Sequence, residues 1–149
     1  MKKSSHKKQT LTIFKAATDT QLLIPFIDEG VKAGFASPAG DYSGNRIDLN
    51  VELIKNKAST FFARVDGDSM TGSLIFDGDI VIVDKSLDVR DGCKVIAFID
   101  GEFVMKTIRM GEGVCYLAPE NDEYPTITVT PDQQFMIWGV VTYVIHKQY

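Results

Sequence analysis

From Thr60 onwards, apolar and polar residues alternate in short runs that are separated by glycine, aspartate, asparagine and proline. A period of two places the apolar side chains on one face of a strand, and turn-forming residues end each run. The pattern predicts strands over residues 60–65, 80–84, 94–99, 102–110, 114–118, 126–129 and 135–146. Short strands joined by tight turns are typical of a mainly β, compact and mostly antiparallel domain.

Asp100 and Gly101 stand between two of these runs and form a strong two-residue hairpin signal. The hairpin places Lys106 on the returning strand. Because strand residues alternate between faces, this lysine shares its face with apolar residues, namely Val104, Ile108 and Met110. We therefore expect its ammonium to lie on an apolar surface, where burial favours the neutral amine.

The residues before Thr60 follow a different pattern. Residues 33–46 are rich in glycine, alanine, serine and proline, which indicates an extended, flexible link that could enter an active site. Apolar positions over residues 49–57, with Asp48 as a cap, predict one short helix. We expect a flexible N-terminal arm over residues 1–40 and a β-rich domain over residues 41–149.

The turn Gly67-Asp68-Ser69-Met70 follows the first predicted strand of that domain and is expected to expose the serine hydroxyl. Ser69 is a candidate nucleophile and Lys106 its candidate base, provided that the lysine pKa falls from about 10.4 by roughly 3 units. The backbone N–H groups of Asp68 and Ser69 are candidates for an oxyanion site. A turn serine and a strand lysine are more often ordinary structural residues, so the pair alone does not establish catalysis.

Composition narrows the alternatives. The chain has 149 residues, of which 44% are hydrophobic and 24% charged, values typical of a globular protein. The longest apolar stretch, residues 135–145, is shorter than the roughly 20 residues of a membrane span, and the lysine-rich start lacks the apolar core of a secretory signal. We expect a cytoplasmic protein with no membrane contact.

Few residues could bind a metal ion or serve as a base for the serine in place of the lysine. Cys93 and Cys115 belong to no ligand cluster, and both are expected to be reduced strand residues, so we expect no metal and no other cofactor. The two histidines are His6 and His146, and neither has the spacing of a Ser-His-Asp triad. A serine with a lysine base remains the arrangement that these residues favour.

Charge divides the chain unevenly. Residues 1–15 carry five lysines and no acidic residue, although the net charge of the whole chain is −4. The rest of the chain is therefore acidic and should repel phosphate. A solvated basic tail is the simpler interpretation of residues 1–15. Without a recognisable reading helix, we expect no direct sequence-specific DNA binding.

The motifs together resemble a known family. They are Ala33-Gly34-Phe35-Ala36-Ser37-Pro38-Ala39-Gly40-Asp41-Tyr42, Arg46-Ile47-Asp48-Leu49-Asn50, Gly67-Asp68-Ser69-Met70, Asp77-Gly78-Asp79, Val83-Asp84 and Asp100-Gly101-Glu102-Phe103-Val104-Met105-Lys106. In order and spacing these resemble the UmuD-like SOS mutagenesis proteins among the LexA-type self-cleaving serine peptidases. The resemblance extends from about residue 30 to residue 149.

The resemblance implies self-cleavage between Ala33 and Gly34, with Ser69 as nucleophile and Lys106 as general base. It also implies a homodimer, stimulation by a RecA filament on single-stranded DNA, and delivery of the cleaved form to a Y-family, UmuC-like translesion polymerase. Ala39-Gly40 repeats the dipeptide and is the competing bond.

Three alternatives bear on this interpretation. A LexA-type repressor carries a helix-turn-helix domain before the cleavage bond, which about thirty residues with Pro25 in their apolar stretch cannot form. Signal peptidases share the Ser/Lys pair but need a membrane anchor. A non-enzymatic accessory module of a polymerase or RecA filament, with Ser69 and Lys106 vestigial, stays open as the second hypothesis.

Overall fold

The computed structural model describes residues 11–21, 23–25 and 46–149. In this part of the chain the strands form an eight-stranded sheet and a separate two-stranded sheet, in which all neighbouring strands are antiparallel. The strands are β1 (Thr12–Lys15), β2 (Leu23–Pro25), β3 (Arg46–Asp48), β4 (Thr60–Arg64), β5 (Ile80–Asp84), β6 (Lys94–Ile99), β7 (Glu102–Met110), β8 (Cys115–Ala118), β9 (Ile127–Val129) and β10 (Phe135–Ile145). A helix, α1 (Leu49–Leu53), and a 3₁₀ turn, η1 (Thr71–Ser73), complete the described elements. The prediction of a mainly β, mostly antiparallel domain is confirmed.

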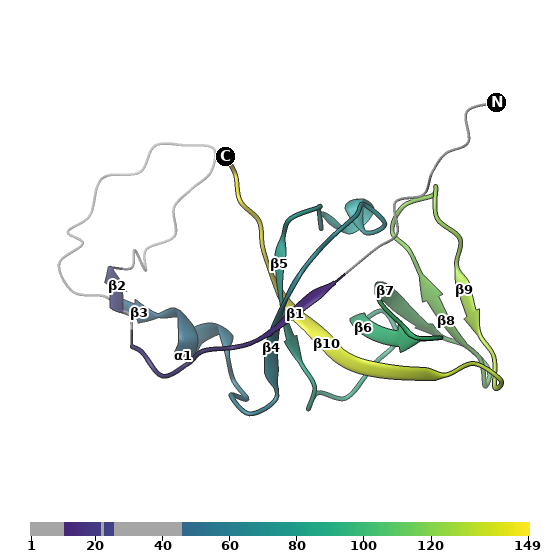
Figure 1. Cartoon of the computed structure of the whole chain (residues 1–149), viewed down its shortest axis with the longest axis horizontal. Coiled ribbons are helices and arrows are strands. Elements are labelled where there is room, and N and C mark those ends of the chain that lie inside the picture. The colour runs from purple at the N-terminus through teal and green to yellow at the C-terminus, as the bar shows by residue number, and fades with distance from the viewer. Residues whose placement is uncertain (1–10, 22, 26–45) are drawn as a thin grey trace.

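Strand β10 joins the two halves of the large sheet, whose order is β1-β4-β5-β10-β6-β7-β8-β9. It is the long curved strand at the centre of Figure 1, where its first part pairs with β6 and its last part with β5. Irregular register between Ile137 and Gly139, and again between Val141 and Tyr143, marks the bend. A Cβ atom on Gly139 would lie 2.6 Å from Val83 Cγ1, so the bend requires glycine here.

The sheet encloses two clusters of buried side chains. The first takes residues from β4, β5, β6 and β7 and from the turn after β4, including Ala63, Met70 and Met105. The second lies among β6, β7, β8 and β10 and includes Ile108 and Leu117. On β7, Met105 belongs to the first cluster, whereas Ile108 belongs to the second and Val104 packs against it, so this strand contributes to both.

The predicted strands of the domain agree closely with the structure. The bounds of β5, β6 and β7 match the predicted ranges 80–84, 94–99 and 102–110. The hairpin turn is also present: Asp100 and Gly101 have φ angles of 47° and 88°, and Ile99 pairs with Glu102 across it. The helix is shorter than predicted and ends at Leu53, but its predicted cap is present, since Asp48 Oδ1 accepts a hydrogen bond from Asn50 N.

Two paired segments precede the predicted strands. Strand β1 pairs with β4, and the short β2 pairs with β3, which leads into α1. Both β1 and β2 lie within residues 1–40, which the sequence analysis assigned to a flexible arm without strands. The division into an arm and a domain at residue 40 stays a prediction.

Candidate active site

Ser69 lies in the turn between β4 and η1, where the chain leaves the sheet. Gly67 begins the turn with a φ of 108°, and its N–H donates to Asp77 Oδ1 at 2.7 Å. Met70, the next residue after Ser69, is buried in the first core cluster. The expectation of an exposed serine was wrong, because Ser69 is 0% exposed. Burial excludes bulk water from the Ser69 hydroxyl, which lies within reach of a side chain on β7.

Lys106 points to this hydroxyl from the middle of β7. Its Nζ donates a hydrogen bond to Ser69 Oγ over 2.9 Å, although 37 positions separate the two residues in sequence. On the same face of β7, Ile108 belongs to the second core cluster and Val104 packs against it, whereas about half of Met110 at the strand end is exposed. The structure therefore brings together the two residues that the sequence analysis paired, and the predicted apolar face holds for Val104 and Ile108 alone.

Burial determines the acid–base character of Lys106. Only 4% of the residue is exposed, and the loss of hydration lowers the pKa of its ammonium from 10.5 to about 8. Tyr124 places its ring centroid 5.9 Å from Nζ, and such a contact favours the cation by about 0.5–1 kcal/mol. A shift from 10.5 to about 8 corresponds to about 3 kcal/mol in the opposite sense, so desolvation is the larger effect.

A loop after β8 covers the serine turn, which the sequence analysis did not anticipate. Glu120 N donates to the Ser69 carbonyl at 2.8 Å, and Gly72 N donates to the Glu120 carbonyl at 2.6 Å. A Cβ on Gly72 would lie 2.4 Å from that carbonyl oxygen, so only glycine allows this approach. Thr107 on β7 also holds the loop, because its hydroxyl donates to Glu120 Oε1 at 2.6 Å.

Asn121 in the same loop fixes the peptide that joins Asp68 to Ser69. Its Nδ2 donates to the Asp68 carbonyl at 2.9 Å, and Thr71 N donates to the same oxygen at 3.3 Å. In a trans peptide the C=O and N–H point in opposite directions, so these bonds also fix the direction of the Ser69 N–H. Such preorganisation suits an oxyanion donor. The assignment of Asp68 and Ser69 to that role stays a prediction.

Tyr124 links the loop to the serine turn through the Asp68 carboxylate, which accepts a hydrogen bond from the tyrosine hydroxyl. That bond is the main cause of a raised Tyr124 pKa. Neither Tyr124 nor Asn121 stood out in the sequence, because a contact over more than fifty positions leaves no periodic signal. The one local hint was the run Asn121-Asp122-Glu123-Tyr124-Pro125, which reads as a turn after a strand.

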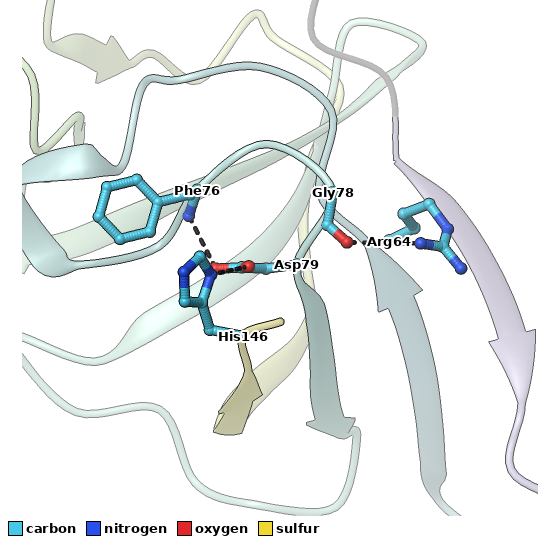
Figure 2. Close-up of polar contacts among 5 residues, drawn as sticks. All are labelled: Arg64, Phe76, Gly78, Asp79 and His146. Carbon is cyan, nitrogen blue, oxygen red and sulfur yellow. Dashed lines mark hydrogen bonds and ion pairs between the residues drawn. The ribbon is translucent and has the colours of Figure 1, made fainter. Parts of the chain in front are cut away.

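A second polar cluster lies at the start of β5, around the buried carboxylate of Asp79 (Figure 2). Asp79 is 3% exposed; its Oδ2 accepts from Phe76 N at 2.8 Å, and its Oδ1 lies 2.5 Å from His146 Nδ1. The ring of His146 also contacts that of Phe76 in a tilted arrangement, with the ring centroids 5.1 Å apart. This histidine therefore joins the residues after β10 to the segment before β5, as Figure 2 shows. Its contacts with Asp79 and Phe76 hold two parts of the fold together.

Several other predicted features have a place in the structure. Asp77 and Gly78, part of one of the family motifs, form a turn, while Cys93 and Cys115 are half-buried thiols. Among the described residues, no cluster of three or more histidine, cysteine, aspartate or glutamate side chains could hold a metal ion. None of the helices in this part of the chain is long and apolar enough to cross a membrane. The predicted bond between Ala33 and Gly34 lies outside the described residues.

Known proteins resemble the chain along most of its length. Residues 25–142 match the family described as Peptidase S24-like. Protein SamA of Salmonella typhimurium is 41% identical over 127 residues, which cover 85% of this chain and 88% of SamA. Protein MucA of Escherichia coli is 38% identical over 121 residues, covering 80% of this chain and 82% of MucA.

A repressor is also similar. LexA repressor 2 of Xanthomonas axonopodis pv. citri is 33% identical over 132 residues, which cover 89% of this chain but 61% of the repressor. The similarity to a protein called a repressor thus leaves more than a third of that protein unmatched, whereas SamA and MucA are matched nearly throughout.

Proposed function

Because the chain belongs to the Peptidase S24-like family and buries Lys106 against the hydroxyl of Ser69, we propose that it is a latent serine peptidase that cleaves itself. The observation that carries the proposal is the 2.9 Å contact between Lys106 Nζ and Ser69 Oγ, with a lysine pKa of about 8. With a pKa of about 8, about a fifth of the Lys106 amines are neutral at pH 7.4 and can accept a proton, whereas an ordinary surface lysine is almost wholly protonated there.

The proposed reaction begins when neutral Lys106 takes the Ser69 hydroxyl proton and the oxygen attacks the carbonyl carbon of Ala33. Backbone N–H groups of Asp68 and Ser69 stabilise the developing oxyanion. The intermediate then collapses, the bond to Gly34 breaks, and the lysine returns its proton to the leaving amine. Water, deprotonated by the lysine, finally hydrolyses the ester between Ser69 and Ala33. The products are an Ala33 carboxylate, a Gly34 amine and the regenerated serine.

The biological role proposed here follows the resemblance to SamA, MucA and ImpA, the UmuD-like relatives. In this role a RecA filament on single-stranded DNA stimulates cleavage in the cytoplasm. The cleaved homodimer then serves a UmuC-like translesion polymerase. No part of the role needs a cofactor or direct sequence-specific DNA binding.

Self-cleavage is tested by incubating the purified chain at pH 9 to 10 and following the products by mass spectrometry. We expect one cut that yields a fragment beginning at Gly34. Ser69→Ala and Lys106→Arg should each lower the rate at least about a thousandfold. The first variant removes the nucleophilic hydroxyl, and the second replaces the base with a guanidinium that cannot lose its proton in this range.

The outcomes of this experiment separate the alternatives. A product beginning at Gly40 would move the cut to the competing bond. An intact parent chain, even with an activated RecA filament, would overturn the peptidase and favour the accessory module with a vestigial Ser69 and Lys106. Circular dichroism of both variants shows whether the loss of cleavage reflects chemistry or unfolding.

A further inference from the structure

Strand β1 occupies one edge of the eight-stranded sheet. Among the described strands it is hydrogen-bonded to β4 alone, and the register pairs Thr12 with Arg64 and Lys15 with Phe61. A sheet edge exposes backbone N–H and C=O groups to any extended chain, so native proteins usually cover such edges. Here β1 covers the edge of β4.

The side chains of this segment also fill apolar space beside the first core cluster. Leu11 and Ile13 pack against that cluster, and Ala16 is 8% exposed. Phe14, on the opposite face of β1, is half exposed. The edge of β4 therefore binds a strand by two features together: its backbone, and the apolar surface on which side chains at alternate positions pack.

This covering strand lies on the N-terminal side of both Ala-Gly bonds, whereas β4 lies on the C-terminal side of both. Strand β2 pairs with β3 across the same bonds, and Asn50 Nδ2 donates to the Thr20 carbonyl at 2.9 Å. These contacts hold the N-terminal segment to the body without a covalent bond. A short two-stranded pair is marginally stable, so β2 and β3 retain the cut fragment weakly, and its retention then depends on the pairing of β1 with β4.

From these positions we propose that the edge of β4 is a docking site for an extended segment of a partner protein, which β1 occupies until the chain is cleaved. The partner segment adds antiparallel to β4 and carries apolar side chains at positions i and i+2, in place of Leu11 and Ile13. Its alternate side chains face water, as Thr12 and Phe14 of β1 do, and a basic residue after them suits the acidic body, as the exposed Lys15 of β1 does. This inference rests on the proposed self-cleavage.

Cleavage acts through effective concentration. While the chain is intact, the tether keeps β1 at roughly millimolar effective concentration beside β4, which a dilute partner cannot match. After cleavage, a fragment that leaves is diluted into the solution, and the partner competes with it on equal terms. Main-chain hydrogen bonds would supply affinity, and the apolar contacts at alternate positions would supply specificity, as in other cases of strand addition.

The test uses a Ser69→Ala chain with a recognition sequence for a site-specific protease inserted within residues 33–40, so that cutting does not depend on Ser69. The probe is a fluorescent peptide with the sequence of residues 10–17, and its control carries aspartate in place of Leu11 and Ile13. After the N-terminal fragment is removed, we expect the body to bind the probe at least about tenfold more tightly than the uncut chain. The control peptide should not bind.

Two uncut variants provide a second measurement if the body unfolds without β1. Ile13→Asp weakens the packing of β1 and should admit the probe without cutting. Thr12→Cys with Arg64→Cys, oxidised, joins residues that face each other across β1 and β4 and should exclude the probe. Hydrogen exchange should show the bound probe protecting amides within Thr60–Arg64.

The outcomes distinguish this inference from the proposed function. Equal binding to the locked, uncut and cut chains, failure to bind any folded form, or protection that omits β4 would overturn the docking edge. Probe binding to the protease-cut chain, with no self-cleavage by the parent, would overturn the peptidase and leave the docking edge standing.

Discussion

Two ionisable side chains are almost equally buried, and their surroundings differ in kind. Asp79 is 3% exposed and Lys106 is 4% exposed. Asp79 receives a backbone N–H from Phe76 and contacts the ring of His146, which ties the end of β10 to the turn before β5. Lys106 donates to the neutral hydroxyl of Ser69, and desolvation lowers its pKa. Similar burial thus supports a structural link in one region and a reactive amine in the other.

The two surroundings differ in how well the partner groups compensate for the hydration that the buried charge has lost. Donors that face a carboxylate compensate for part of its lost hydration, whereas a serine hydroxyl compensates poorly for the desolvation of an ammonium. Groups that hold elements together and groups that react can therefore be distinguished by their partners, more than by their depth in the protein. The predictions below test this distinction.

The largest expected effect is the pH dependence of self-cleavage. The neutral form of Lys106 is active and its pKa is about 8, so the rate should fall about tenfold per unit below pH 8 and level off above it. From pH 8 to pH 5 the loss is about a thousandfold. Timed gels across this range provide the measurement. A rate that did not vary with pH would remove Lys106 from the mechanism.

The second effect concerns stability. The folded pKa of Lys106 is lowered, so the unfolded chain holds more protons between about pH 8 and 10.5, and the parent gains stability as pH rises through that window. Lys106→Met removes the buried ammonium. Below pH 8 its free energy of unfolding should exceed that of the parent by up to about 3 kcal/mol, and the gain should vanish towards pH 10.5.

Urea unfolding at several pH values measures this gain. Lys57→Met, at an exposed position, is the matched control and should change stability little at any pH. A Lys106→Met variant that was less stable than the parent at pH 7 would show that the surroundings of the ammonium compensate for its lost hydration. Lys106 would then not differ from Asp79 in the way stated above.

The third effect belongs to the structural cluster. His146→Ala removes a partner of the buried Asp79 carboxylate and the ring contact with Phe76, and should lower the free energy of unfolding by about 1–2 kcal/mol. His146→Gln, which keeps a donor, should restore part of the loss. Folded His146→Ala should still cleave itself at close to the parent rate. Loss of cleavage without loss of stability would place His146 in the chemistry.

The smallest effect is expected at Tyr124. Tyr124→Phe removes the bond to Asp68 but keeps the ring beside Lys106, so cleavage should slow only a few-fold, with the pH midpoint unchanged. Tyr124→Ala removes a ring contact that favours the cation but also admits water to the ammonium, and because desolvation is the larger effect on this pKa, the midpoint should move upward, towards 10.5. An equal midpoint in both variants would show that the ring does not shield the lysine.

The sequence was most informative where local rules decide the structure. Alternation and turn residues predicted β5, β6 and β7 to the residue, and the Asp100-Gly101 hairpin set the face on which Lys106 lies. Turn chemistry located Ser69 in a turn. The structure added the contact between the two, since no local pattern fixes the distance between a turn and a strand that lie in different parts of a sheet.

Long-range contacts were beyond these rules. The burial of Ser69 depends on Glu120 and Asn121, which approach from a loop after β8. Strand β1 was missed because its four residues lie beside a lysine-rich run, and its stability depends on β4, far along the chain. Short elements that are stabilised by distant partners carry little local signal.

The shared strand β10 has a consequence for how the molecule unfolds. Its residues pair with β6 at one end and with β5 at the other, and Gly139 lets it pass close to Val83 between them. Neither half of the sheet can lose β10 without disturbing the other, so the halves should melt as one cooperative unit. A side chain at Gly139 would collide with Val83 at this junction and strain the pairing of β10 with both of its neighbours. Calorimetry of Gly139→Ala should therefore show a lower melting temperature, with both halves still unfolding together.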